Sequence, residues 1–294
     1  MKSISIIICT RDRAGELANC LPETVRQAKT FDDVEVIVVD NGSADDTLGV
    51  VNRISLELGF RIRYVFEPIP GLSNARNRGR QEAVGRVLAF IDDDVITGGH
   101  WVANIRKHFD SNKSDCLGGK VLAELGCDPP FQMDDSMLWF FQVTNFGQEP
   151  RRLCYPEHPI GCNMAFGTNI FDSVGGFDSS LKLYGDETDF FRRVHEANFS
   201  VEYDPNIEVT QLIPSERLTK EAIREKAFKW GQGSATIWAA EDNALGKRYI
   251  VLMKYAATSV YLWFRYLLQP TFGLYFTYWY NRGFISVIVR RPVS

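Results

Sequence analysis

The amino-acid sequence predicts an α/β fold, in which a mixed, mainly parallel sheet is flanked by helices and followed by a helical, aromatic-rich C-terminal appendage. Four short apolar runs, rich in β-branched residues, have the length of buried strands: residues 3–9, 34–39, 62–66 and 87–91. Three stretches of helical character separate them: residues 14–28, 44–58 and 72–83. Strands that alternate with helices are typical of a parallel sheet whose faces are covered by helices.

The four strand candidates differ in how plainly the sequence marks them. The first, second and fourth runs are apolar almost throughout, as expected of strands buried on both faces. The third run, residues 62–66, alternates in character and is the weakest of the four. Ser43, followed three residues later by Asp46, fits a capping box, so the second helix is expected to begin at residue 44.

Size and composition indicate an ordinary globular protein. The chain has 294 residues, enough for one large core with an appendage or for two modest domains. Its net charge of −4 weighs against nucleic acid as a partner, because nucleic-acid binders usually present a basic face. The six cysteines show neither a C-x-x-C pair nor metal-ligand spacing, and no targeting segment is evident, so a cytoplasmic protein with reduced thiols is expected.

Polar side chains follow each predicted strand at the point where it ends. Thr10-Arg11-Asp12-Arg13 follows the first, Asp40-Asn41-Gly42-Ser43 the second, Glu67 the third, and Asp92-Asp93-Asp94 the fourth. Each segment alone could be a turn. In an open parallel sheet, however, ligands bind at the carboxyl ends of the strands, so four polar segments at one edge indicate a binding site.

The three consecutive aspartates, Asp92 to Asp94, concentrate negative charge at the tip of the fourth strand. Closely spaced carboxylates resist ionising together unless a cation neutralises them. Carboxylate oxygens suit Mg²⁺ or Mn²⁺, which proteins commonly share with a substrate phosphate. A solvated acidic turn is the alternative, so the triplet by itself leaves both interpretations open.

Several motifs, in order and spacing, resemble the family 2 glycosyltransferases of GT-A fold. They occupy about the first three quarters of the chain, at residues 5–13, 38–43, 71–79, 90–94, 161–166, 174–178 and 185–190. The resemblance implies a GT-A type sheet and the transfer of a sugar from a nucleotide diphosphate donor to an acceptor hydroxyl. It further implies inversion at the anomeric carbon, and the acceptor is expected to be a glycan or lipid-linked.

The resemblance assigns the nucleotide to residues near the strand ends. Thr10 and Asp40 match positions that hold the nucleobase, and Arg76 matches a basic residue facing the nucleotide and its phosphates. Arg11 is a further candidate phosphate ligand, because guanidinium groups match phosphate oxygens in two-pronged fashion. Arg13 and Arg78 could act in the same way, but a solvated helix face is the preferred interpretation for both.

The Asp-x-Asp element of the family matches Asp92 to Asp94. The first carboxylate is expected toward the ribose and the last toward the metal, so Asp92 and Asp93 are assigned to the nucleotide, and Asp94 and Asp92 to Mn²⁺ or Mg²⁺. Many relatives also carry a histidine at the position of Gln211, whose carbonyl oxygen is a poorer ligand for Mn²⁺ than imidazole. Asn163 matches a segment near the donor sugar or acceptor and is assigned to the substrate.

The resemblance places the catalytic base in an acidic pair that opens a helix. The family usually has Glu-Asp, whereas this chain has the reverse order, Asp186-Glu187. By alignment Glu187 occupies the position of the base, which would accept the proton of the acceptor hydroxyl. Helix capping is the alternative, because anionic side chains are favoured in the first turn of a helix.

The composition changes near residue 227, so the sequence predicts a catalytic domain over residues 1–226 and a helical region over residues 227–294. From residue 249 the chain is crowded with Tyr, Trp and Phe, and Lys and Arg residues interrupt its apolar runs. This composition argues against a spanning helix and suits a helix at the membrane surface, at the inner face of the plasma membrane, near a lipid-linked acceptor. A helical hairpin packed on the catalytic domain, or on a second subunit in a homo-oligomer, is the alternative.

Two other functions compete with glycosyl transfer. A sugar nucleotidyltransferase also uses an α/β sheet and Mg²⁺, but it tends to carry a Gly-rich loop after the first strand, which Thr10-Arg11-Asp12-Arg13 lacks. A non-catalytic scaffold that binds nucleotide sugars at a membrane is the second. The reversed acidic pair and Gln211 leave this scaffold function open.

The role of Phe140 and Phe141 is a separate open question. They could stack on sugar rings or form a small satellite core.

Overall fold

The structure, a computed structural model, describes residues 3–111, 113–130, 138, 140–144, 146–181, 185–241 and 245–290, with the backbone alone at residues 237, 239–241, 245–249 and 290. The chain forms two compact units. The sheet unit comprises Met1–Glu124, Gln142–Ser179 and Asp186–Leu212. The helical unit comprises Leu125–Phe141, Ser180–Gly185 and Ile213–Ser294.

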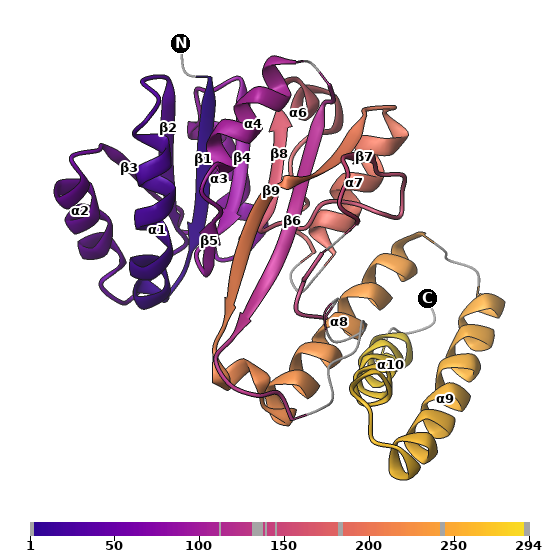
Figure 1. Ribbon diagram of the computed structural model, residues 1–294. Helices are drawn as coiled ribbons and strands as arrows, with labels where there is room; N and C mark the ends of the chain where they lie inside the picture. Colours follow the sequence, from indigo (N-terminus) through magenta and orange to yellow (C-terminus); the bar gives the residue numbers. More distant parts are fainter. Residues whose placement is uncertain are drawn as a thin grey trace. The chain divides into compact units, whose positions relative to one another are not determined.

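The sheet unit contains one mixed sheet in the order β3-β2-β1-β4-β8-β6-β9-β5, with the short β7 paired to β9 (Figure 1). Its strands are β1 Ile4–Thr10, β2 Val34–Asp40, β3 Ile62–Phe66, β4 Val87–Asp92, β5 Val95–Thr97, β6 Cys116–Leu125, β7 Arg151–Arg152, β8 Asn163–Gly167 and β9 Val201–Ile213. The first four pair in parallel, whereas β8 runs antiparallel to both β4 and β6. The predicted mixed sheet is therefore confirmed.

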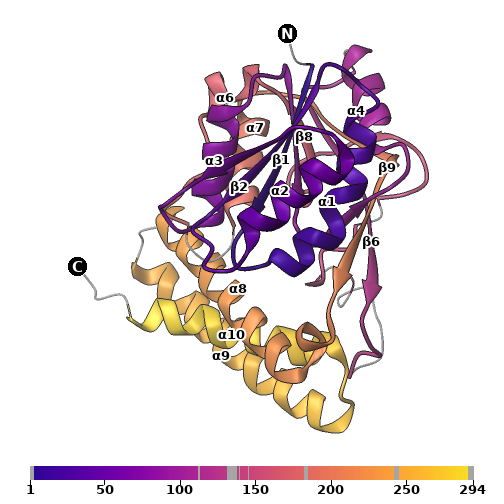
Figure 2. The ribbon, with the colours of Figure 1, turned by 90° about the vertical axis from the view of Figure 1, so that its left-hand side faces the viewer.

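Helices cover both faces of this sheet. They are α1 Ala14–Ala28, α2 Thr47–Leu58, α3 Leu72–Glu82, α4 Trp101–Asp110, α6 Asn169–Val174 and α7 Asp186–Glu196. Figure 2 shows α1, α2 and α4 on one side of the strands and α3, α6 and α7 on the other. This three-layer arrangement is the one predicted from the alternation of strands and helices.

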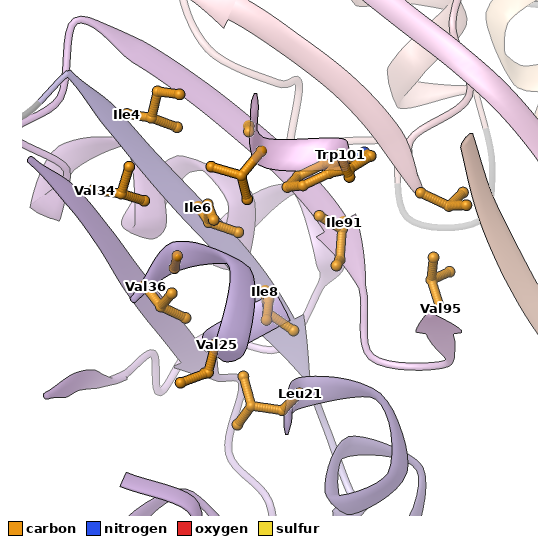
Figure 3. Packing of buried hydrophobic residues seen from close by; sticks show 14 of the residues in the cluster. Ile4, Ile6, Ile8, Leu21, Val25, Val34, Val36, Ile91, Val95 and Trp101 are labelled. Atoms are coloured by element: carbon orange, nitrogen blue, oxygen red, sulfur yellow. The ribbon is translucent and has the colours of Figure 1, made fainter. Parts of the chain in front are cut away.

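Side chains of β1 alternate between two cores. Ile4, Ile6 and Ile8 face α1 and pack with Leu21 and Val25 (Figure 3). The intervening Ile7 and Cys9 belong to the opposite core, which also contains aromatic residues of β4, β8 and α7. Burial on both faces explains why the strand reads as an uninterrupted apolar run rather than an alternating one.

The local predictions hold with one exception. The helix predicted at residues 14–28 and the strand predicted at 62–66 have the predicted bounds. The capping box is wrong: α2 begins at Thr47, and Ser43 instead accepts a hydrogen bond from the backbone N–H of Asp12 at 3.0 Å. Asp45 accepts the N–H of Thr47, so the chain turns once more before the helix begins.

The helical unit contains η1 Ser215–Leu218 and the helices α8 Lys220–Glu241, α9 Leu245–Leu268 and α10 Phe272–Arg290. Within it, Phe140 is fully buried, with ring centroids 5.7 Å from Trp230 and 5.3 Å from Phe272. These contacts favour the satellite core for Phe140 over a sugar-stacking face. In the part of the chain that the structure describes, no helix combines the length and the apolar character that crossing a membrane requires.

Candidate active site

The carboxyl ends of β1, β2 and β4 meet at one edge of the sheet, as predicted. The parallel register places Thr10 beside Asp40 and Cys9 beside Asp92. The end of β3 joins them, because the backbone N–H of Glu67 donates to the Asp40 carbonyl at 2.8 Å. Thr10 and Asp40 are both buried, at 4% and 3% exposure, so their positions are fixed by the sheet itself.

The Asp40 carboxylate is oriented by two donors. The backbone N–H of Ser43 donates to Oδ1 at 2.7 Å, and the Tyr64 hydroxyl donates to Oδ2 at 2.5 Å. Next to it, the Asn41 side chain holds the loop that leads into α3. Its amide oxygen accepts a hydrogen bond from the Gly71 N–H, and its amide nitrogen donates to the carbonyls of Glu67 and Ile69. This loop, and with it the start of α3, is therefore tied to the end of β2.

Asp93 and Asp94 turn into the protein and share one arginine. The Arg13 guanidinium donates to Asp93 Oδ1 at 2.5 Å and to Asp94 Oδ2 at 2.8 Å. The two aspartate side chains are 4% and 3% exposed, and that of Arg13 is 24% exposed. The solvated helix face predicted for Arg13 is therefore wrong: its charge compensates two buried carboxylates, which would otherwise be costly to ionise.

Asp92 takes a different direction from its two neighbours. Its side chain remains 28% exposed and lies 3.8 Å from the guanidinium of Arg76. Burial raises its pKa to about 7, and nearby carboxylates add to this effect while Arg76 opposes it. Burial also raises the pKa of Asp93 to about 6, against the opposing charge of Arg13. Both carboxylates therefore keep a raised pKa in spite of the arginine near each of them.

A buried arginine joins the fourth strand to the acidic pair. Arg76 of α3 is 2% exposed and donates to Asp186 Oδ2 at 3.0 Å and to Glu187 Oε1 at 2.9 Å. Asp186 also accepts from the Ser73 hydroxyl at 3.3 Å, and burial raises its pKa although Arg76 opposes the shift. Arg76 thus gathers Asp92, Asp186 and Glu187 into one cluster.

Two glycines allow this cluster to form. A side chain at Gly79 would collide with Ile7, so the glycine lets α3 lie close against β1. A Cβ at Gly161 would collide with the Glu187 carboxylate and the Arg76 guanidinium. Instead, the Gly161 N–H donates to Glu187 Oε2 at 3.0 Å, so both oxygens of this carboxylate are oriented.

Three other residues that the sequence analysis considered as phosphate or substrate ligands are not part of this cluster. Arg11 is 49% exposed and pairs only weakly with its neighbour Asp12, at 3.6 Å. Arg78 pairs with Glu82 one turn along α3 and is 41% exposed, in agreement with the predicted helix face. Asn163 is 2% exposed.

The Asn163 amide makes three hydrogen bonds within the protein. It accepts from the Trp101 indole at 2.9 Å and donates to the carbonyls of Lys120 and Ile207 at 3.2 and 2.8 Å. Both N–H groups are used, so the side chain could offer a substrate only the second lone pair of its oxygen, and its assignment to the substrate stays a prediction.

The oxygen atoms near Asp94 fit a hard divalent cation. Gln211 lies in β9, where the N–H of the next residue, Leu212, donates to the Asp94 carbonyl at 2.8 Å. The side chain of Gln211 is buried, and its Oε1 has no hydrogen-bond partner among the described residues. Over the same residues, no group of three His, Cys, Asp or Glu side chains is arranged to hold a metal ion. Carboxylate and amide oxygens are the ligand types that such a cation prefers, and the assignment of the metal to Asp92 and Asp94 stays a prediction.

Sequence reasoning missed the positions of Arg13, Asn41 and Gly161. Arg13 and Asn41 are recognisable as polar residues at strand ends, yet their partners lie in other segments of the chain. Asn41 pairs with a loop 26 to 30 residues away, and Arg13 with residues 80 and 81 positions away. Gly161 carried a weak signal, because it lies two residues before β8 and glycines associated with strands often mark a close approach of the backbone.

Comparisons with known proteins agree on the fold and the family. The sequence profile of "Glycosyl transferase family 2" matches residues 5–175. The succinoglycan biosynthesis protein ExoM of Rhizobium meliloti is 26% identical over 85% of this chain and 80% of its own length. A glucosyl-dolichyl phosphate glucuronosyltransferase of Haloferax volcanii is 24% identical over 63% of this chain and 58% of its own.

Among solved structures, the mannosyltransferase PcManGT of Pyrobaculum calidifontis, in complex with GDP-Man and Mn²⁺, has a TM-score of 0.66. It is 16% identical and is matched over 98% of this chain and 86% of its own. TarS 1-349 of S. aureus has a TM-score of 0.57 at 19% identity, over 78% of this chain and 65% of its own. These likenesses confirm the GT-A fold.

The family match covers more than half of the chain and includes the ends of β1, β2 and β4 as well as Arg76 and Gly161. It decides between the enzyme classes that the sequence left open. The chain belongs to glycosyl transferase family 2 and is a glycosyltransferase.

Proposed function

We propose that this glycosyltransferase moves a sugar from a nucleotide diphosphate to an acceptor hydroxyl with inversion and with the help of Mn²⁺ or Mg²⁺. One observation carries the proposal: the buried Arg76 brings Asp92, at the sheet edge, together with Asp186 and Glu187, at the start of α7. In this proposal Asp92 serves the donor, and Asp186 and Glu187 serve the acceptor, so that both groups needed for an in-line displacement at a sugar carbon lie close together.

The nucleotide is proposed to bind along the ends of β1 and β2. Thr10 and Asp40 would contact the base, with Asp40 oriented by Tyr64 and Ser43. Asp92 and Asp93 would lie at the ribose side, and Arg11 is exposed and so able to reach a phosphate. The structural neighbour PcManGT was solved with GDP-Man bound, which supports a nucleotide-diphosphate sugar as the donor class.

Asp94, Asp92 and Gln211 are the proposed ligands of the cation. The buried Gln211 oxygen, which has no hydrogen-bond partner in the part of the chain that the structure describes, supports this set. When bound, the cation would neutralise the charge that develops on the leaving diphosphate. Arg13 would have to release Asp94 in part, since its guanidinium bonds that carboxylate at 2.8 Å. The Mn²⁺ in the PcManGT structure is consistent with this choice of metal.

Glu187 is the proposed general base. Its carboxylate is 16% exposed and is aimed by Arg76 and by the Gly161 N–H, which leaves lone pairs for an acceptor hydroxyl. As the acceptor oxygen forms its bond to the anomeric carbon, Glu187 takes the hydroxyl proton while the bond to the diphosphate breaks on the opposite side. Asp186 would share the arginine and keep Glu187 in place.

The acceptor is proposed to be a glycan or a lipid-linked sugar, and the location the cytoplasmic face of the plasma membrane. The names of the two relatives, one concerned with succinoglycan and one with a dolichyl phosphate, support these acceptor classes. All six cysteines are free thiols, in keeping with a reducing compartment. Residues 1–226 remain the proposed catalytic domain, and a homo-oligomer remains a proposal.

Donor turnover by Glu187→Gln tests the assignment. In a panel of nucleotide sugars tested with Mn²⁺, we expect one donor to raise the unfolding temperature of the wild type and to be consumed by it. Loss of the base should lower turnover about 10²- to 10⁴-fold with donor binding retained. Glu196→Gln, on the same helix but 61% exposed, is the matched control and should leave turnover unchanged. Turnover by Glu187→Gln at the wild-type rate would refute the proposed base.

A further inference from the structure

Helix α9 of the helical unit carries a row of large apolar side chains that face solvent. Ile250, Met253, Val260, Phe264 and Leu267 are 59–69% exposed. We propose that this row, the α9 stripe, docks on a membrane surface that contains anionic lipids. The proposal is independent of the catalytic assignment, because it uses no residue of the active site.

The α9 stripe has the geometry of one continuous face. Its members are spaced by three, four or seven residues, so at 3.6 residues per turn they project within an arc of roughly 100°. With a rise of 1.5 Å per residue, the stripe extends for about 26 Å. Single exposed apolar residues are common on soluble proteins, but a contiguous row of this length marks an interaction surface.

The opposite face of α9 already holds the helix in place. Tyr255 stacks on Phe284 of α10 with ring centroids 4.2 Å apart, and Tyr266 lies 5.4 Å from Tyr275. Ser259 and Leu262, on the same side as these tyrosines, are 5% and 9% exposed. The α9 stripe is therefore not required for packing within the helical unit, and its exposure needs another explanation.

The charge of the C-terminal region indicates the occupant. Residues 245–294 contain seven Lys and Arg and no Asp or Glu, so the remainder of the chain has a formal charge of −11 against −4 for the whole. Lys254 and Arg265 both project from one flank of the stripe, roughly 100° around the helix from its centre. A basic flank beside an apolar row attracts anionic headgroups while the row enters the acyl boundary.

A second copy of the chain fits this face less well. Two copies of α9 that met through their stripes would bring together two basic flanks with no acidic residue in either helix. An anionic lipid surface removes that repulsion. The side chains of Tyr261 and Trp263, 57% and 39% exposed, are of the kind that settles at the headgroup level.

Vesicle flotation of the full-length protein tests the proposal. We expect the protein to float with vesicles of phosphatidylcholine and phosphatidylglycerol, and to bind vesicles of phosphatidylcholine alone far less. Phe264→Glu should lower the bound fraction at least about tenfold, because binding scales with the buried apolar area. Leu56→Glu places the same charge at an 83% exposed leucine of α2 and should bind like the wild type.

The basic flank is tested separately. Lys254→Glu together with Arg265→Glu should abolish the preference for phosphatidylglycerol, and salt well above about 0.1 M should weaken binding by the wild type. Unchanged unfolding temperatures will show that these variants are folded. The proposal is overturned if Phe264→Glu and Leu56→Glu float equally. It is also overturned if the wild type ignores vesicles but forms a dimer that Phe264→Glu dissociates.

Discussion

Replacing Arg76 with methionine is expected to destabilise the sheet unit strongly. The arginine side chain is 2% exposed and makes two close ion pairs, at 3.0 Å to Asp186 and 2.9 Å to Glu187. Methionine fills a similar volume but leaves these carboxylates, with Asp92 nearby, without their cation. The variant therefore tests whether Arg76 is the group that allows three acidic side chains to share one site.

The expected loss of stability follows from the burial of the ion pairs that Arg76 makes. Removing one partner of a buried ion pair costs about 3–5 kcal/mol. Because Asp186 and Glu187 keep 13% and 16% of their side chains exposed, water relieves part of the cost, and we expect the lower end, about 3 kcal/mol. At roughly 2–4 °C per kcal/mol for a domain of this size, the unfolding temperature should fall by about 6–12 °C.

The loss should depend on pH in a defined direction. The pKa of Asp92 is raised in the folded protein from 3.8 to about 7, so its ionisation destabilises the fold. That cost is absent below the pKa of Asp92 in the unfolded chain and complete above its pKa in the folded protein. Without Arg76 the pKa of Asp92 in the folded protein rises further. The loss of stability of the variant relative to the wild type should therefore be largest above pH ~7 and shrink toward pH ~5.

Thermal unfolding followed by fluorescence across this pH range measures both effects. Arg192→Met is the matched control, because Arg192 pairs with Asp189 and Glu196 at 2.8 Å but is 34% exposed. Exposed pairs contribute about 0–1 kcal/mol, so this control should lose little. The reasoning is refuted if the two variants unfold together, or if the deficit of Arg76→Met grows as the pH falls.

Three further predictions concern the active site. Asp92→Asn should raise the unfolding temperature above pH ~7, since it removes a partly buried charge whose pKa is raised in the folded protein, and should abolish donor turnover. Gly161→Ala should lower turnover by displacing Glu187, whereas Gly15→Ala, at an open position of α1, should leave turnover unchanged and the unfolding temperature unchanged or slightly raised, because alanine favours a helix. Gln211→Leu removes a buried oxygen without a partner among the described residues, so stability should hold or rise, while the stabilisation of the protein by Mn²⁺ in thermal unfolding should diminish.

The sequence determined the order of the elements and the edge of the sheet at which polar groups gather. Apolar runs of strand length and the helices between them depend on local periodicity, and a parallel sheet brings its carboxyl ends together whatever the details of packing. Thr10, Asp40 and Asp92 were therefore placed correctly relative to one another. The start of α2 was not, because Asp and Ser side chains can satisfy either a turn or a helix cap.

Only the tertiary structure decided which charges meet. Arg13 reaches Asp93 across 80 positions of the chain, and Arg76 reaches Asp186 across 110. Local sequence pattern specifies that a segment is polar, but not which of its side chains turns inward. That choice follows from the packing of helices on the sheet, where a buried carboxylate is stable only if a cation is brought within a few ångströms of it.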